Sequence, residues 1–451
     1  MRPAPRFSGV RDLIFVPSLW QASSDGRGAA VVGFGCGGGL VRMGIAPRTA
    51  PADEERLERA YVTRLIALFC SGWAVIYADR TILYPLLTVI AREFGLTGFQ
   101  TGLISGTYFT LYVAAMLPAG LLAERLGLKR TLVGFFFVSA AGVAGFGAAA
   151  VNYLTLLAMA GLHGAGAGAY YTMAYSITIH TVPSRHRGVA SGVINGGMSV
   201  GLAVGLALAG PLYQATASWR TPFAILAVPT LLMAALFHRA VREVPIPRRR
   251  ATPMWELLRD PTLLRMNLSG FCVLYGWWVV LSWGPVFFQS ERNVSLTMSG
   301  LYTLVIAATA IPSGLILGRL SDRIGRKRII LAMLPLMALS LVVIPQVTSR
   351  TGMLLALLAY GLVGKLAWDP VAIAWLGDYA ARRRPEAVGT AVALFSFSSV
   401  MSAVVAPPVT GWIKDVTGSL AGGFYVAAGV VLAAFALSLG PADGRRDRGA
   451  P

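Results

Sequence analysis

The sequence predicts an all-α membrane protein with twelve transmembrane helices, arranged as two six-helix halves related by pseudo-symmetry. Three observations lead to this prediction. Hydrophobic residues make up 55% of the chain and charged residues only 13%, whereas soluble domains carry about 25% charged residues. Apolar stretches long enough to cross a bilayer recur along the chain. One short charged motif occurs twice, at corresponding places in two parts of the chain.

The apolar stretches are long enough to cross a hydrocarbon core of about 30 Å, because an α-helix rises about 1.5 Å per residue. The twelve predicted spans cover approximately residues 65–90, 99–122, 131–151, 154–180, 188–214, 219–240, 265–289, 297–318, 329–346, 352–378, 387–413 and 421–440. An even number of spans leaves both ends of the chain on the same side of the membrane.

The repeated motif relates the two halves. It reads GLLAERLGLKR from Gly120 to Arg130 and GRLSDRIGRKR from Gly318 to Arg328. Each copy has a glycine four residues before an acid, then an arginine, a second glycine and a basic pair. The copies start at 120 and 318, which are 318 − 120 = 198 residues apart. Two matched copies after corresponding spans indicate an internal duplication.

The duplication divides the chain into domains. Spans one to six form a first half at residues 64–240, and spans seven to twelve form a second half at 265–440. Residues 241–264 contain prolines and a basic run, so we expect a cytoplasmic linker there. We expect residues 1–63 to be a disordered cytoplasmic tail and residues 441–451 to be a second cytoplasmic tail.

Basic residues alternate between the two sides of the predicted membrane. The net charge is +19, and the loops on one side, with the adjoining span ends and the C-terminal tail, hold 23 Arg or Lys residues against 5 in the other loops and their span ends. The positive-inside bias therefore predicts that both termini are cytoplasmic, and the predominance of Arg (35) over Lys (4) suggests a bacterial inner membrane. A nucleic-acid site would gather its charge in one patch, so we expect a lipid bilayer and no nucleic acid as surroundings.

The sequence predicts neither an enzyme nor a metal site. It has three cysteines and four histidines, without the spacing of a metal site or a nucleophile–base pair. We therefore expect no cofactor. The sequence carries little information on oligomeric state, and we expect a monomer.

Few charged groups lie inside the spans, and each needs a reason, because a charge at the bilayer centre costs roughly 2.5–3.5 kcal/mol. Span one carries Asp79 and Arg80, and span ten carries Lys365 and Asp369. His163 in span four is the one histidine in the middle of a span. We expect the substrate and proton sites among these five residues.

Span one has the pattern of an anion site. At about 100° per residue, Trp73, Tyr77, Arg80 and Tyr84 lie on one face of the helix. A guanidinium flanked by aromatic rings stays protonated and offers a planar fork to a carboxylate. Asp79 points about 100° away and is expected to face a neighbouring helix and to take part in proton coupling. The alternative is that Asp79 and Arg80 satisfy each other, or a buried network, without touching substrate.

Spans four, seven and ten supply further candidates. Lys365 could be a second substrate contact, released when Asp369 gains a proton, although two residues four apart can also form a simple ion pair. His163 could handle protons because imidazole titrates near neutral pH, or could be hydrogen-bonded in a helix interface. Tyr275 and Trp278 lie on one stripe of span seven and could contact substrate or only pack.

The repeated motif resembles the loops that follow helices two and eight in the major facilitator superfamily. This resemblance implies a twelve-helix fold in which helices one, four, seven and ten line a central cavity. It also implies that acid–base pairs at the loops act as a gate between two conformations. The gate residues carried over from the resemblance are Gly120, Glu124, Arg125, Gly127, Gly318, Asp322, Arg323, Gly325 and Arg326.

Three segments resemble the anion:cation symporter family more narrowly: YADRTILYPLLTVIAREFGLT, SWGPVFF and TGWIKDVTGS. That resemblance implies uptake of organic anions with protons or sodium. One segment departs from the family, because AGLHGAGAG places Ala160 and Ala167 where the family has Arg and Glu on helix four. Proton coupling would then depend on Asp79, Asp369 or His163.

The sequence as a whole predicts proton-coupled uptake of a small organic anion, such as a carboxylate, by alternating access. The alternative is a proton-driven exporter of lipophilic or cationic compounds, with Asp79 or Asp369 as the cation site. A third class, a membrane sensor on the same scaffold, would bind a ligand without moving it.

Overall fold

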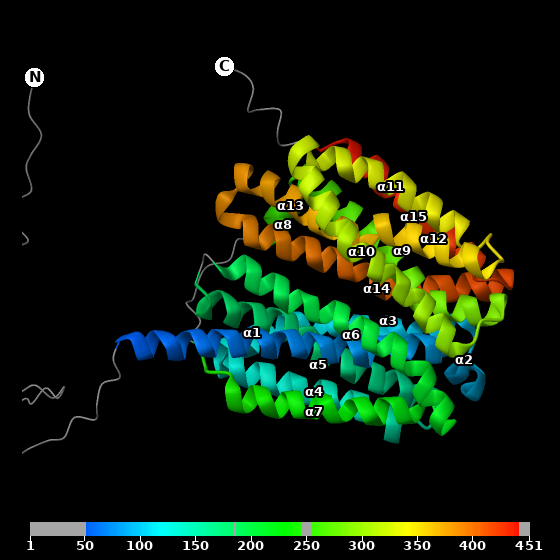
Figure 1. Cartoon of the computed structure of the whole chain (residues 1–451), viewed down its shortest axis with the longest axis horizontal. Helices are drawn as coiled ribbons and strands as arrows, with labels where there is room; N and C mark the ends of the chain where they lie inside the picture. Colours follow the sequence, from blue (N-terminus) through cyan, green and yellow to red (C-terminus); the bar gives the residue numbers. More distant parts are fainter. Residues whose placement is uncertain (1–50, 184–185, 245–253, 442–451) are drawn as a thin grey trace, which may run out of the picture. The chain divides into compact units, whose positions relative to one another are not determined.

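The computed structural model describes residues 51–183, 186–244 and 254–441, and every regular element in these ranges is a helix (Figure 1). The first half comprises α1 (Pro51–Thr81), α2 (Leu83–Phe94), α3 (Gly98–Leu126), α4 (Leu128–Ala148), α5 (Tyr153–Thr181), α6 (Arg187–Thr216) and α7 (Arg220–Ala240). The second half comprises α8 (Met254–Leu258), α9 (Pro261–Arg292), α10 (Leu296–Ile324), α11 (Arg326–Val343), α12 (Arg350–Val363), α13 (Lys365–Arg383), a 3₁₀ turn (Pro385–Ala387), α14 (Val388–Thr417) and α15 (Ala421–Leu439).

The described helices agree with the twelve predicted spans. Ten helical segments are long and apolar enough to cross a membrane, counting the pairs α1–α2 and α12–α13 as one segment each. The other two spans are α5, which is rich in glycine and contains a buried histidine, and α11, which begins with three basic residues. With these two, the described part of the chain holds twelve long helical segments.

Spans one and ten are broken rather than continuous. The first break lies at Ile82, between α1 and α2. Pro85 explains it, because proline has no N–H and its ring clashes with the carbonyl group four residues earlier, at Thr81. The second break lies at Gly364, between α12 and α13. Each break falls beside charged residues that the sequence singled out.

Two predicted boundaries differ from the structure. Helix α1 begins at Pro51, so residues 51–63 are helical where a disordered tail was expected. Their sequence, PADEERLERAYVT, is rich in strong helix formers. The predicted linker contains the short helix α8 and the first turn of α9, whose N-cap Asp260 accepts hydrogen bonds from the backbone. The remaining tail residues, 1–50 and 442–451, and residues 245–253 of the linker lie outside the described ranges.

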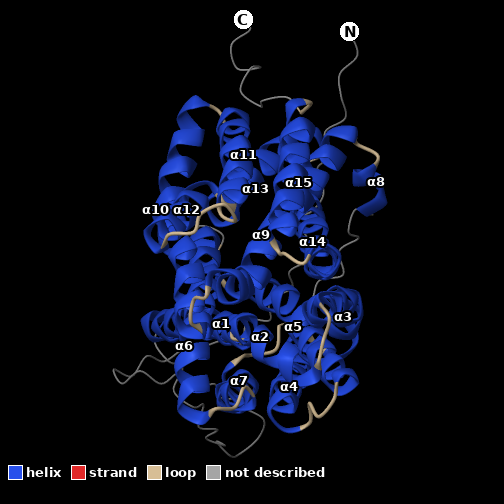
Figure 2. Cartoon of the chain, turned by 90° about the vertical axis from the view of Figure 1, so that its right-hand side faces the viewer, coloured by secondary structure: helices blue, strands red, loops and turns tan. Residues whose placement is uncertain are grey.

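The two halves of the described helices occupy separate layers, with α2–α7 in one and α8–α15 in the other (Figure 2). They contact each other through α3 and α14, α6 and α10, and α2 and α9. The end of the bundle that carries the repeated motifs, near Gly127 and Gly325, is called the motif end. The other end, where α2 joins α3 and α9 joins α10, is called the opposite end.

The closest contacts between the halves lie at the opposite end. The carboxylate of Asp415 on α14 accepts hydrogen bonds from the backbone N–H groups of Gly98 and Phe99, at 2.6 and 2.7 Å. A Cβ atom on Gly98 would lie only 2.4 Å from the carbonyl oxygen of Gly411. Thr88 of α2 also donates to Gln289 of α9 at 2.6 Å. Hydrogen bonds therefore hold this end closed.

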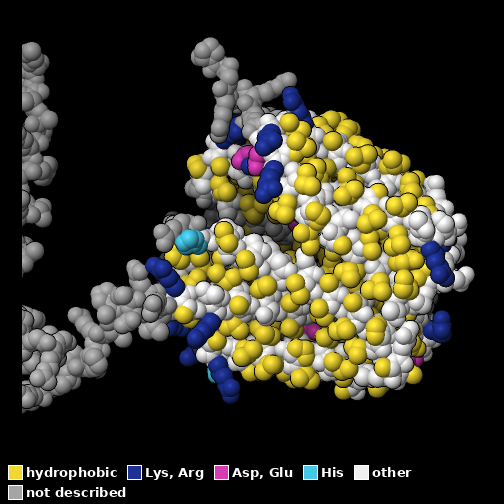
Figure 3. Space-filling view, in the orientation of Figure 1, with side chains coloured by type: hydrophobic (Ala, Val, Ile, Leu, Met, Phe, Trp, Pro, Cys, Tyr) yellow, Lys and Arg dark blue, Asp and Glu magenta, His cyan; other side chains and the backbone are white. Residues whose placement is uncertain are grey.

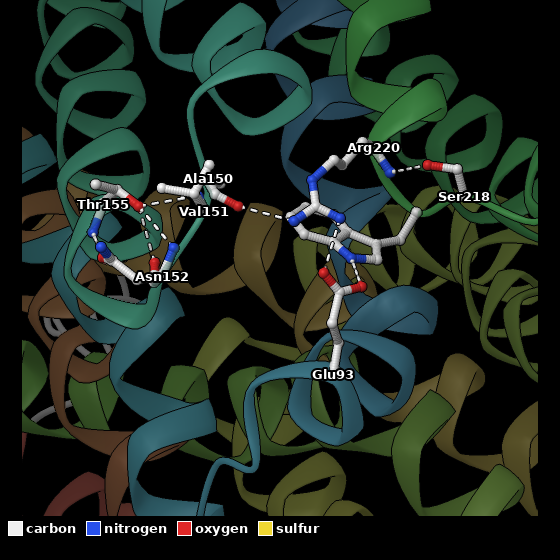
Figure 4. Close-up of polar contacts among 8 residues, drawn as sticks. Glu93, Ala150, Val151, Asn152, Thr155, Ser218 and Arg220 are labelled. Carbon is white, nitrogen blue, oxygen red and sulfur yellow. Dashed lines mark hydrogen bonds and ion pairs between the residues drawn. The ribbon is translucent and has the colours of Figure 1, made fainter.

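A clamp built on Glu93 ties the first half together at the opposite end (Figure 4). The carboxylate forms an ion pair with Arg220 at 2.8 Å and accepts a hydrogen bond from the indole N–H of Trp219 at 2.6 Å. Arg220 also donates to the carbonyl group of Ala150, at 3.0 Å. One acid thus joins α2 to the loops α4–α5 and α6–α7.

The second half has a corresponding clamp. Glu291, at the end of α9, accepts hydrogen bonds from the hydroxyl group of Ser419 and the N–H of Leu420, at 2.7 and 2.6 Å. The neighbouring Arg292 donates to carbonyl groups of the loop between α11 and α12. Glu93 and Glu291 are 291 − 93 = 198 residues apart, which is the offset of the repeated motif.

Candidate functional site

Arg80 lies in the last turn of α1, where the chain breaks, and only 6% of it is exposed. Its guanidinium carbon lies 3.9 Å from the ring centre of Tyr77 on the same helix. The rings of Phe109 on α3 and Trp278 on α9 lie 5.3 and 5.2 Å away. These are cation–π distances, and the rings come from both halves of the fold. The guanidinium therefore lies in an aromatic cage.

Several buried polar atoms around this cage lack a hydrogen-bond partner among the described residues. They are Nε and Nη2 of Arg80, the hydroxyl groups of Tyr84 and Tyr108, and the indole N–H of Trp278. A buried donor without an acceptor costs about 1–3 kcal/mol. All of these groups can donate a hydrogen bond. An anion with several oxygen atoms would supply the acceptors that they lack.

Asp79 has two different surroundings on its two oxygens, and it is 1% exposed. Thr230 of α7 donates to Oδ2 at 2.8 Å, and Oδ1 has no partner among the described residues. No ion pair joins Asp79 to Arg80 in the described part of the chain. Asp79 thus faces the interior of the first half, toward α7, while Arg80 faces the aromatic cage.

The two residues share one small cavity of about 10 Å³, which is also lined by Ser105, Tyr108 and His163. A space of this size holds about one water molecule. The cavity joins the carboxylate of Asp79, the guanidinium of Arg80 and the imidazole of His163 within the first half. It is too small for an organic acid in this conformation.

His163 reaches the cavity because α5 packs closely against its neighbours. Cβ atoms on Gly142 of α4 and Gly164 of α5 would lie 2.3 and 2.0 Å from the backbone of the facing helix. The imidazole lies edge-on to the Tyr108 ring, 4.9 Å between centres. Its Nε2 has no partner among the described residues. The glycine-rich segment AGLHGAGAG therefore places a titratable group where larger residues would separate the helices.

Lys365 and Asp369 form an ion pair at 2.9 Å, with side chains 18% and 27% exposed. Lys365 is the first residue of α13, where a positive charge opposes the helix dipole. Asp369, one turn later, offsets that cost. The electrostatic surroundings of Lys365 include Tyr77 and Arg80 from the first half. In this conformation Lys365 and Asp369 therefore form the simple ion pair within one helix that their four-residue spacing allowed.

Of the other residues predicted to contact substrate, some surround Arg80 in the aromatic cage and the others pack between helices. Tyr77, Tyr84 and Trp278 surround Arg80, as described above. Trp73 packs against Tyr170 and Tyr77, with ring centres 4.9 and 5.6 Å apart. Tyr275 is buried beside Thr410 of α14.

The cage also includes residues that the sequence analysis did not propose. Ser105, Tyr108 and Phe109 of α3 line the cavity, and the Phe109 ring lies 4.4 Å from that of Trp278. They follow i, i+3, i+4 spacing, which puts them on one face of the helix. The sequence could have indicated them through this stripe of aromatic and hydroxyl side chains in span two, although the same spacing is also typical of residues that only pack against a neighbouring helix.

The second copy of the motif clamps helices within its own half. Gly325 has φ +107°, a conformation that favours glycine, and it ends α10. Arg326 then forms an ion pair with Asp378 of α13 at 2.8 Å and a longer one with Asp322 at 3.4 Å. It also donates to the carbonyl group of Ala374.

The first copy uses different residues. Gly127 has φ +93°, like its counterpart. The position of Arg326 is taken by Leu128, which is buried. The carboxylate of Glu243, after α7, accepts a hydrogen bond from the backbone N–H of Lys129 at 3.1 Å. The two loops thus have the same backbone turn and different electrostatics.

The other motif residues lie on the surface of this conformation. A Cβ atom at Gly120 or Gly318 would meet nothing within 4 Å. The side chains of the charged members are exposed: Glu124, Arg125, Asp322 and Arg323.

Comparison with known proteins identifies the family. The family model of the Major Facilitator Superfamily matches residues 69–365 and 266–450. A probable sulfoacetate transporter from Cupriavidus necator is 24% identical over 58% of this chain and 65% of its own length. A probable galactarate/D-glucarate transporter from Bacillus subtilis is 22% identical over 87% of this chain and 94% of its own. A hexuronate transporter from the same organism is 24% identical over 82% and 91%.

Solved structures agree on the fold. The D-xylose–proton symporter superposes with a TM-score of 0.70 at 16% identity, over 85% of this chain and 99% of its own. A bacterial homolog to the human lysosomal transporter Spinster gives 0.70 at 17% identity, over 84% and 96%. The chain therefore belongs to the Major Facilitator Superfamily and is a multi-pass membrane transporter rather than an enzyme.

Proposed function

We propose that this chain carries a small organic anion, such as a carboxylate, into the cell together with a proton, by alternating access. The observation that carries the proposal is the buried guanidinium of Arg80, which has aromatic neighbours and two nitrogen atoms without acceptors among the described residues. The relatives named as sulfoacetate, glucarate and hexuronate transporters support an anionic substrate. We propose that this chain also carries an anion and that Arg80 binds it.

The contacts between the halves support alternating access. Those with the shortest distances lie at the opposite end, around Asp415 and Gln289. At the motif end, Figure 3 shows the surface hollowed between the two halves, on the left. We propose that this hollow is the cytoplasmic opening. A substrate released there would leave Arg80, and the aromatic cage would contract to the small cavity described above.

For coupling we propose that Asp79 binds the proton. Its free oxygen lines the same cavity as Arg80 and His163. A sodium ion would need several oxygen ligands, and the guanidinium in this cavity would repel it. The proton is therefore the better candidate for the coupling ion. We further propose cytoplasmic termini, a bacterial inner membrane and a monomer.

The alternative, export of lipophilic cations, would need an available carboxylate between the halves. Asp369 is already paired with Lys365 at 2.9 Å, and Asp79 faces α7 inside the first half. The aromatic residues alone would suit either substrate class. The charge at the centre favours the anion.

The test uses purified protein and a panel of organic acids and lipophilic cations. At one hundred times its dissociation constant, a ligand adds about 2.7 kcal/mol to the free energy of unfolding, which a thermal shift detects. The best acids are then followed as labelled uptake into proteoliposomes with an imposed pH gradient. We expect carboxylates or sulfonates to stabilise the protein and to accumulate on the alkaline side.

Arg80→Ala tests the site, with Arg92→Ala as the matched control, because Arg92 is an exposed arginine one helix further on. Hydrogen bonds to charged groups contribute about 1.5–3 kcal/mol each, so losing two predicts at least a 100-fold weaker affinity. Arg92→Ala should bind normally. Stabilisation by lipophilic cations alone, or full acid binding by a folded Arg80→Ala variant, would overturn the proposal.

A further inference from the structure

A groove of about 550 Å³ lies at the motif end of the first half, between the first turns of α4 and the last turn of α7. It is separate from the cavity at Arg80 and shares no lining residue with it. Its lining includes Leu126, Lys129, Arg130, Val133, His238 and Glu243. The proposed function uses none of these side chains.

One wall of the groove is polar and carries available positive charge. Within the described part of the chain, the side chains of Lys129 and Arg130 form no ion pair. Glu243 accepts its hydrogen bond from the backbone N–H of Lys129, at 3.1 Å, and so caps α4. Lys129, Arg130 and His238 therefore line the groove together with the carboxylate of Glu243, and the two positive charges outnumber the one negative charge.

The other wall is apolar. Leu126 is 48% exposed and Val133 is 8% exposed. Gly134 belongs to the same lining, and a Cβ atom there would meet nothing within 4 Å. The missing side chain leaves open space beside Val133 on this wall of the groove. A ligand that fits both walls has an anionic head and a hydrocarbon tail.

The position of the groove agrees with such a ligand. It lies where two spans end, the depth at which lipid headgroups lie, and Figure 3 shows Lys and Arg side chains gathered at this end. In the sequence, Arg248, Arg249 and Arg250 follow α7 within ten residues. Basic residues next to a span attract anionic lipids.

We propose that this groove binds the phosphate-bearing headgroup of an anionic phospholipid, with one acyl chain along Leu126, Val133 and Gly134. The phosphate would accept hydrogen bonds from Lys129 and Arg130. Such a lipid would link α4 to α7 at the motif end, in the half that lacks an arginine equivalent to Arg326. The site is independent of the identity of the transported substrate.

Native mass spectrometry and thermal shifts on the full-length protein test the site. The probes are phosphatidylglycerol, phosphatidylcholine and soluble glycerol phosphate. The double variant Lys129→Gln/Arg130→Gln removes two charges of about 1 kcal/mol each, so its affinity for phosphatidylglycerol should fall about 30-fold. Gly134→Leu leaves the charge unchanged but places a side chain in the space proposed for the acyl chain, and it should also release the lipid.

Matched controls separate this site from general effects of charge. Lys327→Gln/Arg328→Gln makes the same charge change in the second motif, where Lys327 already donates to the carbonyl group of Leu439 at 2.7 Å. Gly429→Leu adds the same side chain at another open helical position. Both should retain the lipid. Equal binding of phosphatidylcholine, equal stabilisation by glycerol phosphate, or retention by both groove variants would overturn the proposal.

Discussion

A guanidinium group buried among three aromatic rings loses most of its hydration, and at Arg80 no carboxylate in the described residues replaces it. Tyr77, Phe109 and Trp278 stabilise the charge through their ring faces. The rings do not accept hydrogen bonds from Nε and Nη2 of Arg80. The cage thus holds a cation in the protein while leaving its directional bonding capacity for a ligand.

Asp79→Asn should separate transport from the proton gradient. The amide keeps the size of the side chain, and its oxygen can still accept from Thr230, which now donates at 2.8 Å. It cannot take up and release a proton. We expect exchange of labelled for unlabelled substrate to persist, while accumulation driven by a pH gradient falls to the level of equilibration.

Two measurements on the same proteoliposomes check this: exchange without a gradient, and net uptake with one. Asp369→Asn is the control, because Asp369 is the other carboxylate within the spans. If Asp79→Asn still accumulates substrate against its gradient, the proton is carried elsewhere, and His163 becomes the candidate. If exchange is lost as well, Asp79 is needed for folding or binding rather than for coupling.

Residue spacing alone brought Tyr77, Arg80 and Tyr84 to one face, because a helix has a fixed period. Tyr108 and Ser105 were not predicted as site residues, because their surroundings depend on how α3 packs against α1 and α5. Thr230 was missed for the same reason: nothing in its own sequence indicates that it faces Asp79. Partners between helices are set by packing, which periodicity does not encode.

At the scale of helices, two kinds of contact lie at the opposite end. Asp415 joins the halves by accepting from Gly98 and Phe99. Glu93 and Glu291 each tie helices within one half. A rocking motion of rigid halves would break the first kind and preserve the second.

Asp415→Asn should therefore shift the conformational equilibrium. The neutral amide has one oxygen instead of two, so one hydrogen bond is lost and the other weakened, at about 1.5–3 kcal/mol for a bond to a charged group. A loss of 1.4 kcal/mol changes the ratio of the two conformations about tenfold. We expect pairs of spin labels across the halves at the opposite end to show an increased population at long distance.

Glu93→Gln is the control for this experiment. It weakens the ion pair with Arg220 and leaves the contacts between the halves untouched. It should lower thermal stability without changing the distance distribution between α3 and α14. An unchanged distribution in Asp415→Asn would mean that other contacts, such as Thr88 with Gln289, keep this end closed.

The helices themselves show what sequence patterns can and cannot predict. Length and hydropathy located the spans, because crossing a bilayer requires a long apolar helix. The break at Ile82 was foreseeable from Pro85, whereas the break at Gly364 depends on how that turn is packed. Residues 51–63 were predicted as disordered because they precede the membrane, although their composition favours a helix.

At the scale of the whole molecule, the duplication is visible in the clamps as well as in the motif. Glu93 and Glu291 keep the offset of 198 residues and both bind loops at the opposite end. Arg326 and Leu128 occupy equivalent positions but differ in charge. The opposite end has thus kept its symmetry, while the motif end ties its helices by an ion pair in one half and by Glu243 in the other.

The motif glycines suggest what happens in the second conformation, in which the motif end is closed. Glycine within a helix costs up to about 1 kcal/mol relative to alanine, and Gly120 has no close neighbour here that would require it. At the other end of the same helix, Gly98 and Gly102 contact the backbone of α14. We expect Gly120 to make a similar contact when the motif end closes.

Gly120→Leu should consequently block transport without affecting binding. The side chain has room in the present conformation, so thermal stabilisation by substrate should match the unmodified protein. Uptake and exchange should both fall to background, because each requires closure of the motif end. Gly429→Leu, also at an open helical position, should transport normally. Normal uptake by Gly120→Leu would show that the motif end closes without contact at this glycine.

The charge carried per cycle follows from which carboxylates can hold a proton. Asp369 is paired with Lys365 at 2.9 Å, whereas Oδ1 of Asp79 has no partner among the described residues, so we expect Asp79 to be the single proton carrier. A monocarboxylate entering with one proton moves no net charge. One pH unit then supplies about 1.4 kcal/mol, or about tenfold accumulation, and the membrane potential adds nothing. Two protons per substrate would instead add about 2.3 kcal/mol per 100 mV.

Proteoliposomes with a potassium gradient and valinomycin distinguish these cases at constant pH: we expect accumulation of a monocarboxylate to be unaffected by the imposed potential. An increase of accumulation with an inside-negative potential, abolished by Asp369→Asn, would assign a second proton to the pair in α13.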